Sequence, residues 1–268
     1  MPLRAIRLPA LTRRHSNVAV AAIDVVIAYA VWQLASATGA LPARYFPPAS
    51  VVLAHLWEMA GTAAFWGVLG QTLQSWSIGL VLSIVTAIPL GIALGSSSRA
   101  FRLWQAVIEA LRPIPPVVLI PIALLVFGPT LQMKLVLILQ ASFWILLLQS
   151  IYGIRAVDPI ALQTAHSMRL GRWREFALVR LPGALPLVVT GIRIAATFSL
   201  IASVVAELVG GAPGLGNEIL KAESIGDQST MYALIVVTGF LGIAVNVIFR
   251  RLERRLLFWH PSQRGAQR

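Results

Sequence analysis

The stretch Val68–Leu94 reads VLGQTLQSWSIGLVLSIVTAIPLGIAL, and this stretch decides the fold. It lies inside an interval between Glu58 and Arg99 in which no residue carries a charge. A helix needs about 20 apolar residues to cross the roughly 30 Å hydrocarbon core of a bilayer. We therefore predict that Val68–Leu94 forms a helix that crosses a membrane.

The composition of the whole chain extends this prediction. Of the 268 residues, 57% are hydrophobic and 12% are charged, and the mean hydropathy is +0.79. These values lie outside the usual range of soluble globular domains. The net charge of +12 does not indicate a nucleic-acid partner, because the basic residues flank apolar runs and are not interleaved with aromatic residues. The chain is expected to lie in a lipid bilayer and to bind no nucleic acid.

Enzymatic and metal-binding signatures are missing from the sequence. The chain has no cysteine, and its four histidines do not have the spacing of a zinc site. It also lacks a G-x-x-x-x-G-K-[ST] phosphate loop, an H-E-x-x-H helix and a G-x-S-x-G turn. We predict a chain that is not an enzyme and binds no cofactor or metal. Any transport that it performs draws on an ion gradient or on force from another subunit.

The search for uncharged runs predicts an all-α, polytopic membrane protein with six transmembrane helices in one domain over residues 1–268. The six predicted spans are Ser16–Ala37, Val68–Leu94, Ile114–Phe127, Leu135–Ile154, Leu185–Ala206 and the interval between Asp227 and Arg250. Four prolines crowd the start of the third span, where they remove backbone donors: Pro113, Pro115, Pro116 and Pro121. In the second span, the spacing of Gly91 and Gly95 allows another helix to approach closely.

The arginines predict the orientation of these spans. With the N-terminus in the cytoplasm, 18 of the 22 Lys and Arg residues fall on the cytoplasmic side, and Arg44, Lys134 and Lys221 fall outside. Both termini are therefore expected in the cytoplasm, as a short N-terminal arm and a disordered C-terminal tail, HPSQRGAQR. The first span exceeds the usual length of a signal-peptide core, so we interpret it as an uncleaved helix.

Four ionisable residues fall within or near the predicted spans. Asp24 and Arg193 lie inside spans, whereas Glu109 and Glu207 lie near span ends. Side chains near helix ends extend to the membrane interface and a lone acid can pair locally, so a local role is favoured over a transport role for each. An ion-coupled carrier usually places more ionisable groups within its spans.

An Arg-rich island, ALQTAHSMRLGRWREFALVRLPGALP, occupies Ala161–Pro186 between the fourth and fifth spans. Its spacing predicts two short helices, one ending near Met168 and one starting near Gly171. In the second helix, one face carries Trp173, Phe176 and Ala177, and the more exposed positions are Arg172, Arg174 and Glu175. From the residues alone, such a segment docks a partner or lies on anionic lipid headgroups, and both interpretations stay open.

This island resembles the E-A-A-x3-G-x9-I-x-L-P loop of the membrane-spanning permease subunits of bacterial ATP-binding-cassette (ABC) importers that depend on a binding protein. Aligned on Leu181 and Pro182, the Glu-Ala-Ala positions fall on Gln163, Thr164 and Ala165, the glycine on Arg169 and the isoleucine on Val179. Because only glycine is free of strain at positive φ, Arg169 predicts a shifted or differently shaped turn, with Gly171 the nearest glycine. The resemblance runs from about Leu41 to Gly216 and includes Leu111–Pro116, Gly153–Pro159 and Gly214–Gly216. These segments are most similar to those of the nitrate, sulfonate and taurine branch of the permease family.

The resemblance implies a fold, partners and site residues. It implies a cytoplasmic coupling loop that inserts into an ATPase groove, carried by Gln163, Thr164, Ala165, Arg169, Gly171, Arg172, Trp173, Phe176, Leu181 and Pro182. Two ATPase subunits would hold ATP and Mg, a periplasmic or lipid-anchored solute-binding protein would deliver the solute, and a second permease copy would complete the pathway in the bacterial plasma (inner) membrane. Pro115, Pro116 and Glu207 are expected to shape that pathway.

The transported solute stays open at this point. The branch favours sulfonates, nitrate or taurine, whereas relatives also handle neutral heterocycles. Two other classes of protein remain as alternatives: an ion-coupled secondary transporter and a noncatalytic membrane scaffold.

Overall fold

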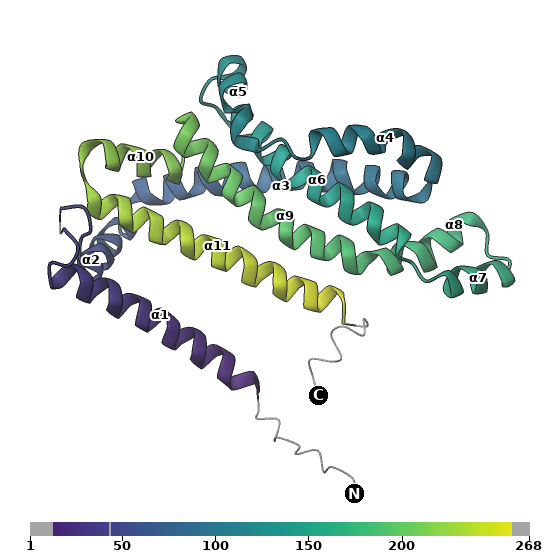
Figure 1. The fold of residues 1–268 in the computed structure, drawn as a ribbon, viewed down its shortest axis with the longest axis horizontal. Coiled ribbons are helices and arrows are strands. Elements are labelled where there is room, and N and C mark those ends of the chain that lie inside the picture. Colours follow the sequence, from purple (N-terminus) through teal and green to yellow (C-terminus); the bar gives the residue numbers. More distant parts are fainter. Residues whose placement is uncertain (1–12, 43, 259–268) are drawn as a thin grey trace, which may run out of the picture.

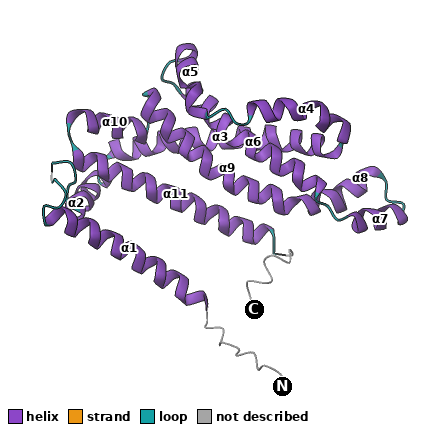
Figure 2. Cartoon of the chain, in the orientation of Figure 1, coloured by secondary structure: helices purple, strands orange, loops and turns teal. Residues whose placement is uncertain are grey.

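The computed structural model describes residues 13–42 and 44–258, and every element within these residues is helical (Figures 1 and 2). The elements are α1 (Arg13–Ala37), α2 (Ala49–Ala60), α3 (Ala63–Ser96), α4 (Ser98–Leu111), η1 (Pro116–Leu119), α5 (Ile120–Phe127), α6 (Leu131–Arg155), α7 (Pro159–Ser167), α8 (Arg172–Glu175), η2 (Phe176–Arg180), α9 (Leu181–Gly210), α10 (Leu215–Ile225) and α11 (Gln228–Leu256). The predicted N-terminal arm before Arg13 and the predicted tail HPSQRGAQR lie outside the described residues.

Five of the six predicted spans are confirmed as helices: α1, α3, α6, α9 and α11. Within the described residues, four segments are long and apolar enough to cross a membrane: α3, α6, α11 and the run that contains α9. The bent combination of α4 with η1 and α5 adds a fifth candidate. Large apolar side chains on the outer surface, including Val85, Leu125 and Ile243, are more than half exposed. Such an apolar surface requires an apolar surrounding.

Helix α6 lies between α3 and α9 and forms the centre of the bundle (Figure 1). Its side chains Leu146, Leu147 and Ile151 are fully buried in the largest hydrophobic cluster. A Cβ atom on Gly91 of α3 would lie 2.6 Å from the carbonyl oxygen of Leu147, so only glycine allows this approach of the two backbones. The close packing predicted from the Gly91 and Gly95 spacing is confirmed.

The third predicted span, Ile114–Phe127, is helical over Pro116–Phe127 as η1 and α5, but it is a span candidate only together with α4. The chain forms α4, breaks over residues 112–115, and resumes as η1 and α5, with a bend of 79° between the two parts. Pro115 and Pro116 cause the break, because each lacks a backbone donor and each restricts the residue before it. The Nε2 of Gln140 on α6 donates to the carbonyl oxygens of Leu111 (3.2 Å) and Ile114 (3.0 Å). One side chain thus satisfies two carbonyls that the break frees.

Three further helices, α2, α4 and α10, were not predicted. Charged residues such as Arg102 and Glu109 in α4 interrupt the uncharged runs on which the prediction relied. The bundle has two ends: α7 and α8 project from one, called here the loop end, and α2 and α10 lie at the other, called the α10 end (Figure 1). Helix α1 begins and α11 finishes toward the loop end (Figure 1).

Candidate functional site

The loop end carries the two short helices predicted from the Arg-rich island, α7 and α8. Helix α7 finishes in a Schellman motif: the N–H of Arg169 donates to His166 O (2.9 Å) and the N–H of Leu170 donates to Ala165 O (3.1 Å). This motif requires a left-handed residue, and Arg169 has φ of 51°, the only positive φ of a non-glycine residue in the described chain. The prediction that Arg169 shifts or reshapes the turn is wrong. The two backbone hydrogen bonds hold the arginine in the conformation that the glycine would adopt.

Substituting Arg169→Gly is expected to stabilise this helix pair. A non-glycine residue in the left-handed region costs about 1–2 kcal/mol, part of which the greater entropy of glycine in the unfolded chain offsets. The amides of residues 166–176 should exchange with solvent about fivefold more slowly, corresponding to roughly 1 kcal/mol. Arg172→Gly, at a helical position, is the matched control and should accelerate exchange. Faster exchange in Arg169→Gly would show that the arginine side chain holds the turn.

Helix α8 and the start of η2 carry an aromatic pair in which Trp173 is exposed and Phe176 is partly buried. The Trp173 side chain is 78% exposed and its ring stacks on that of Phe176, with centroids 6.1 Å apart. Arg172 is also exposed beside them. These three residues are called the Trp173 face. An exposed indole stacked on a partly buried phenyl ring, with a neighbouring guanidinium, has the composition of a protein-binding hot spot.

Glu175 does not lie on the exposed side, contrary to the prediction. It is 6% exposed, and its Oε1 accepts a hydrogen bond of 2.7 Å from Arg180 Nε. His166 Nε2 of α7 lies 3.6 Å from Glu175 Oε2. The carboxylate therefore turns inward and fastens α8 to both α7 and η2.

The other predicted loop residues lie close to this face in the chain. Gln163, Thr164 and Gly171 are exposed, Ala165 is buried, and Leu181 and Pro182 are partly buried in the first turn of α9. The loop is thus a projecting pair of short helices that connects the end of α6 to the start of α9.

A buried ion pair lies at the α10 end. Lys134 of α6 and Glu207 of α9 are 3% and 0% exposed, and Lys134 Nζ lies 3.1 Å from Glu207 Oε1. The ammonium also donates to Gln71 O (3.3 Å) and Pro213 O (2.8 Å). Lys134 was predicted to lie on the outer side of the membrane, and the structure buries it at the end of the bundle opposite the loop end. The local pairing favoured for Glu207 is confirmed.

The second carboxylate oxygen of Glu207 binds the turn between α9 and α10. Its Oε2 accepts from Thr72 Oγ1 (2.9 Å) and from the N–H of Gly216 (3.1 Å). Thr72 Oγ1 in turn accepts from the N–H of Leu215 at 2.9 Å. A Cβ atom on Gly216 would lie 2.7 Å from the backbone nitrogen of Leu208, so glycine is needed for this approach. Glu207 thus fastens the turn that contains Gly214–Gly216, a segment of the family resemblance, to the end of α9.

Arg193, the other charged residue predicted to lie inside a span, also pairs locally. Its Nε lies 3.1 Å from Glu253 Oε2 on α11, and Thr190 donates to the same carboxylate at 2.7 Å. Asp24 is exposed on α1. Neither Arg193 nor Asp24 lines either of the two cavities described next.

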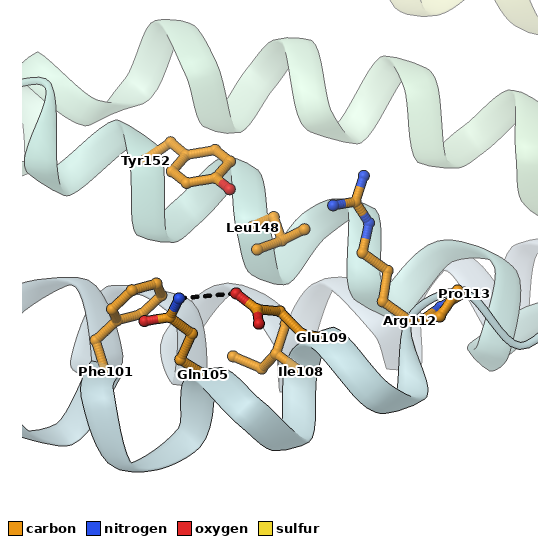
Figure 3. Close-up of a pocket in the computed structure, with 8 residues that line it drawn as sticks. All are labelled: Phe101, Gln105, Ile108, Glu109, Arg112, Pro113, Leu148 and Tyr152. Carbon is orange, nitrogen blue, oxygen red and sulfur yellow. Dashed lines mark hydrogen bonds between the residues drawn. The ribbon is translucent and has the colours of Figure 1, made fainter.

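Two adjoining cavities lie beside the break between α4 and η1. One has a volume of about 450 Å³ between α4 and α6, and the other about 320 Å³ between the break, α6 and α9. Arg112, Leu148 and Tyr152 line both. Of the predicted pathway residues, Pro116 lines the second cavity, whereas Pro115 and Glu207 line neither. Glu109, predicted near a span end, lines the first and accepts from Gln105 Nε2 at 2.7 Å (Figure 3).

A protein-family model described as the binding-protein-dependent transport system inner membrane component matches residues 87–258. The chain belongs to this family. Among its relatives, the permease is 29% identical to the taurine transport system permease protein TauC of Escherichia coli strain K12, over 86% of both chains. It is 30% identical to the putative aliphatic sulfonates transport permease protein SsuC of the same organism, over 87% of this chain and 89% of that one. It is 27% identical to the nitrate import permease protein NrtB of Leptolyngbya laminosa, over 72% and 69% of the two chains.

The fold of the permease also matches solved structures of ABC transporters. The MetNI methionine ABC transporter in an inward-facing conformation superposes with a TM-score of 0.63 at 19% identity, over 73% of this chain and 99% of that chain. The permease is therefore a membrane-spanning transport subunit of an ABC importer, of the nitrate, sulfonate and taurine branch that its sequence resembles. The family-matched region contains the Trp173 face, the Lys134–Glu207 pair and both cavities at the α4–η1 break.

Proposed function

We propose that the permease forms, with a second copy of itself, the pathway for a small oxyanion such as taurine, another sulfonate or nitrate. An external binding protein delivers the solute, and two ATPase subunits that hold ATP and Mg drive transport. The names of the relatives support this solute class, and paired subunits related by a two-fold axis are the usual arrangement for such assemblies.

In this proposal the chain crosses the inner membrane six times. The spans are α1, α3, the bent unit of α4 with η1 and α5, then α6, α9 and α11. Both termini and the loop end face the cytoplasm, which puts α7 and α8 between the fourth and fifth spans. The arginine-rich composition of the loop supports this orientation. The whole chain then forms one permease domain.

The observation that carries the proposal is the Trp173 face on its projecting helix pair. Glu175 fixes α8 to α7 and η2, and η2 continues directly into α9. Motion of a bound ATPase would therefore pass into a spanning helix without a flexible connection. We assign the coupling role to the Trp173 face together with Gln163, Thr164, Ala165, Arg169, Gly171, Leu181 and Pro182.

The proposal is tested by purifying the permease gently from its native membrane and identifying the proteins that accompany it by mass spectrometry. An ATPase subunit at a near 1:1 ratio to the permease is expected. Repeated recovery without an ATPase, from preparations that retain other weak complexes, would favour a carrier or a scaffold. Uptake that survives ATP depletion and collapses with the ion gradient would identify an ion-coupled carrier, and no uptake under either condition would identify a scaffold.

A further inference from the structure

The two cavities at the α4–η1 break share a charged lining residue, Arg112, whose side chain is exposed. Their walls on α6 run from Gln140 to Tyr152, and their wall on α9 includes Ile194 and Phe198. Gln140, Ile194 and Phe198 lie within the length of their helices, whereas Tyr152 lies near the end of α6 at the loop end. Arg112, which was expected on the cytoplasmic side, follows the last residue of α4 and lies at the break itself.

Arg112 has no ion-pair partner among the described residues. The acid nearest in sequence, Glu109, lines the same cavity and accepts a hydrogen bond from Gln105. The carbonyl oxygen of Leu111, at the end of α4, accepts from Gln140, so this carbonyl already has a donor. Figure 3 shows the Arg112 side chain extended from the end of α4 toward the side on which Leu148 and Tyr152 lie. The guanidinium is thus available to a ligand.

An unpaired cation within a spanning segment is energetically unfavourable, so such residues mark pathways for ions and substrates. Discontinuous helices commonly build the binding sites of transport proteins near the middle of the membrane. We propose that the cavities at the α4–η1 break form an anion-binding subsite of the translocation path, in which Arg112 binds the oxyanion group of the solute. This inference rests on the proposed function for its ligand class.

The walls fit a small organic oxyanion. The five donors of a guanidinium match the oxygens of a sulfonate, nitrate or carboxylate in a bidentate arrangement. Trp144, Ile145 and Phe198 supply apolar surface against which the carbon part of a sulfonate can pack. Gln149 and Tyr152 add polar groups at the same walls. A combined volume of several hundred cubic ångströms is large enough for a solute of this size.

The first test is chemical and does not depend on transport. The intact complex of permease and ATPase in detergent is treated with phenylglyoxal, and the modified arginines are mapped by mass spectrometry. Taurine, ethanesulfonate or nitrate is expected to slow modification of Arg112 saturably, by about tenfold at ten times the half-protecting concentration. Neutral ethanediol should give no protection, and Arg102, an exposed arginine of the same helix, should be unaffected by any probe. Absence of protection by all three anions overturns the subsite.

The second test uses ATP-driven uptake of the same probes by the complete transporter in proteoliposomes. Arg112→Gln should reduce uptake by about 10- to 100-fold, the effect of losing a charge-assisted hydrogen bond, while thermal stability and basal ATP hydrolysis are unchanged. Arg112→Lys should restore part of the uptake, and Arg102→Gln should leave it at the wild-type rate. Wild-type uptake in Arg112→Gln, or a loss of stability that accounts for its defect, overturns the inference. Protection of Arg112 without uptake in the wild type would retain the subsite and reject the proposed solute class.

Discussion

Replacing Glu207 with alanine is expected to destabilise the folded permease by about 3–5 kcal/mol, because it leaves the buried Lys134 ammonium without its counter-charge. The same substitution removes the acceptor for Thr72 and for the N–H of Gly216. The thermal unfolding midpoint in detergent should fall on the order of 10 °C. Lys134→Ala should have an effect of similar size.

Glu253→Ala is the matched control for this prediction. Glu253 also pairs with a cation at 3.1 Å, but its partner Arg193 is 30% exposed, so solvent can reach the charge that remains. Its removal should cost about 1 kcal/mol. Equal losses of unfolding free energy in Glu207→Ala and Glu253→Ala would show that burial of the Lys134–Glu207 pair does not determine how much the pair stabilises the fold.

The double variant Lys134→Met with Glu207→Gln separates the charge from the hydrogen bonds. It removes both buried charges, and the glutamine oxygen retains an acceptor for Thr72 and Gly216. The double variant should therefore be more stable than either Lys134→Met or Glu207→Gln alone, with a coupling energy of about 1–3 kcal/mol between the two sites. Additive losses would argue that the two residues act independently.

The long helices were predictable because one physical rule determines them. An interval without charges, such as the one between Glu58 and Arg99, has to be covered by lipid or by other apolar helices, and α3 extends the predicted span Val68–Leu94 by a few residues at each end within that interval. The two short helices of the loop were predictable for a related reason, since Met168 and Gly171 mark their boundaries. In both cases the information is local in the sequence.

The missed features depend on partners that are distant in the chain. Gln140 satisfies the carbonyls at the α4–η1 break from a different helix, and no pattern around the prolines indicates it. Lys134 and Glu207 each appeared to be an ordinary residue near a span end, because their pairing joins positions 73 residues apart. The buried position of the pair is a property of the packed bundle.

Arg169 was misinterpreted for a different reason. Conformational preference alone predicts that an arginine avoids positive φ, yet two backbone hydrogen bonds in the Schellman motif outweigh that preference. The position of the turn is therefore set by the backbone of α7 and not by the identity of residue 169. A signal existed in the sequence, since the alignment on Leu181 and Pro182 already put Arg169 at the glycine position of the family loop.

Replacing the whole Trp173 face, with Arg172→Ala, Trp173→Ala and Phe176→Ala together, is expected to abolish ATP-driven uptake. Aromatic and arginine hot spots each contribute about 2 kcal/mol or more to an interface, so the triple variant should weaken ATPase binding by at least about 1,000-fold. Membrane insertion and the thermal unfolding midpoint should not change, because Arg172 and Trp173 are exposed and the partly buried Phe176 belongs to none of the hydrophobic core clusters of the described residues. Uptake into proteoliposomes and recovery of the ATPase with the purified permease measure the two effects.

Arg174→Ala is the matched control, since Arg174 is an exposed arginine in the same short helix and lies outside the Trp173 face. Uptake by this variant should remain close to the wild-type rate. If the triple variant transports normally, the Trp173 face does not couple the permease to its ATPase, and the loop is instead a basic helix that lies on anionic headgroups. If Arg174→Ala abolishes uptake as completely as the triple variant does, the positive charge of α8 determines ATPase binding and the aromatic pair does not. The stacked rings of Trp173 and Phe176 thus distinguish an inserted protein contact from a lipid contact, because only a closed protein groove buries both of them.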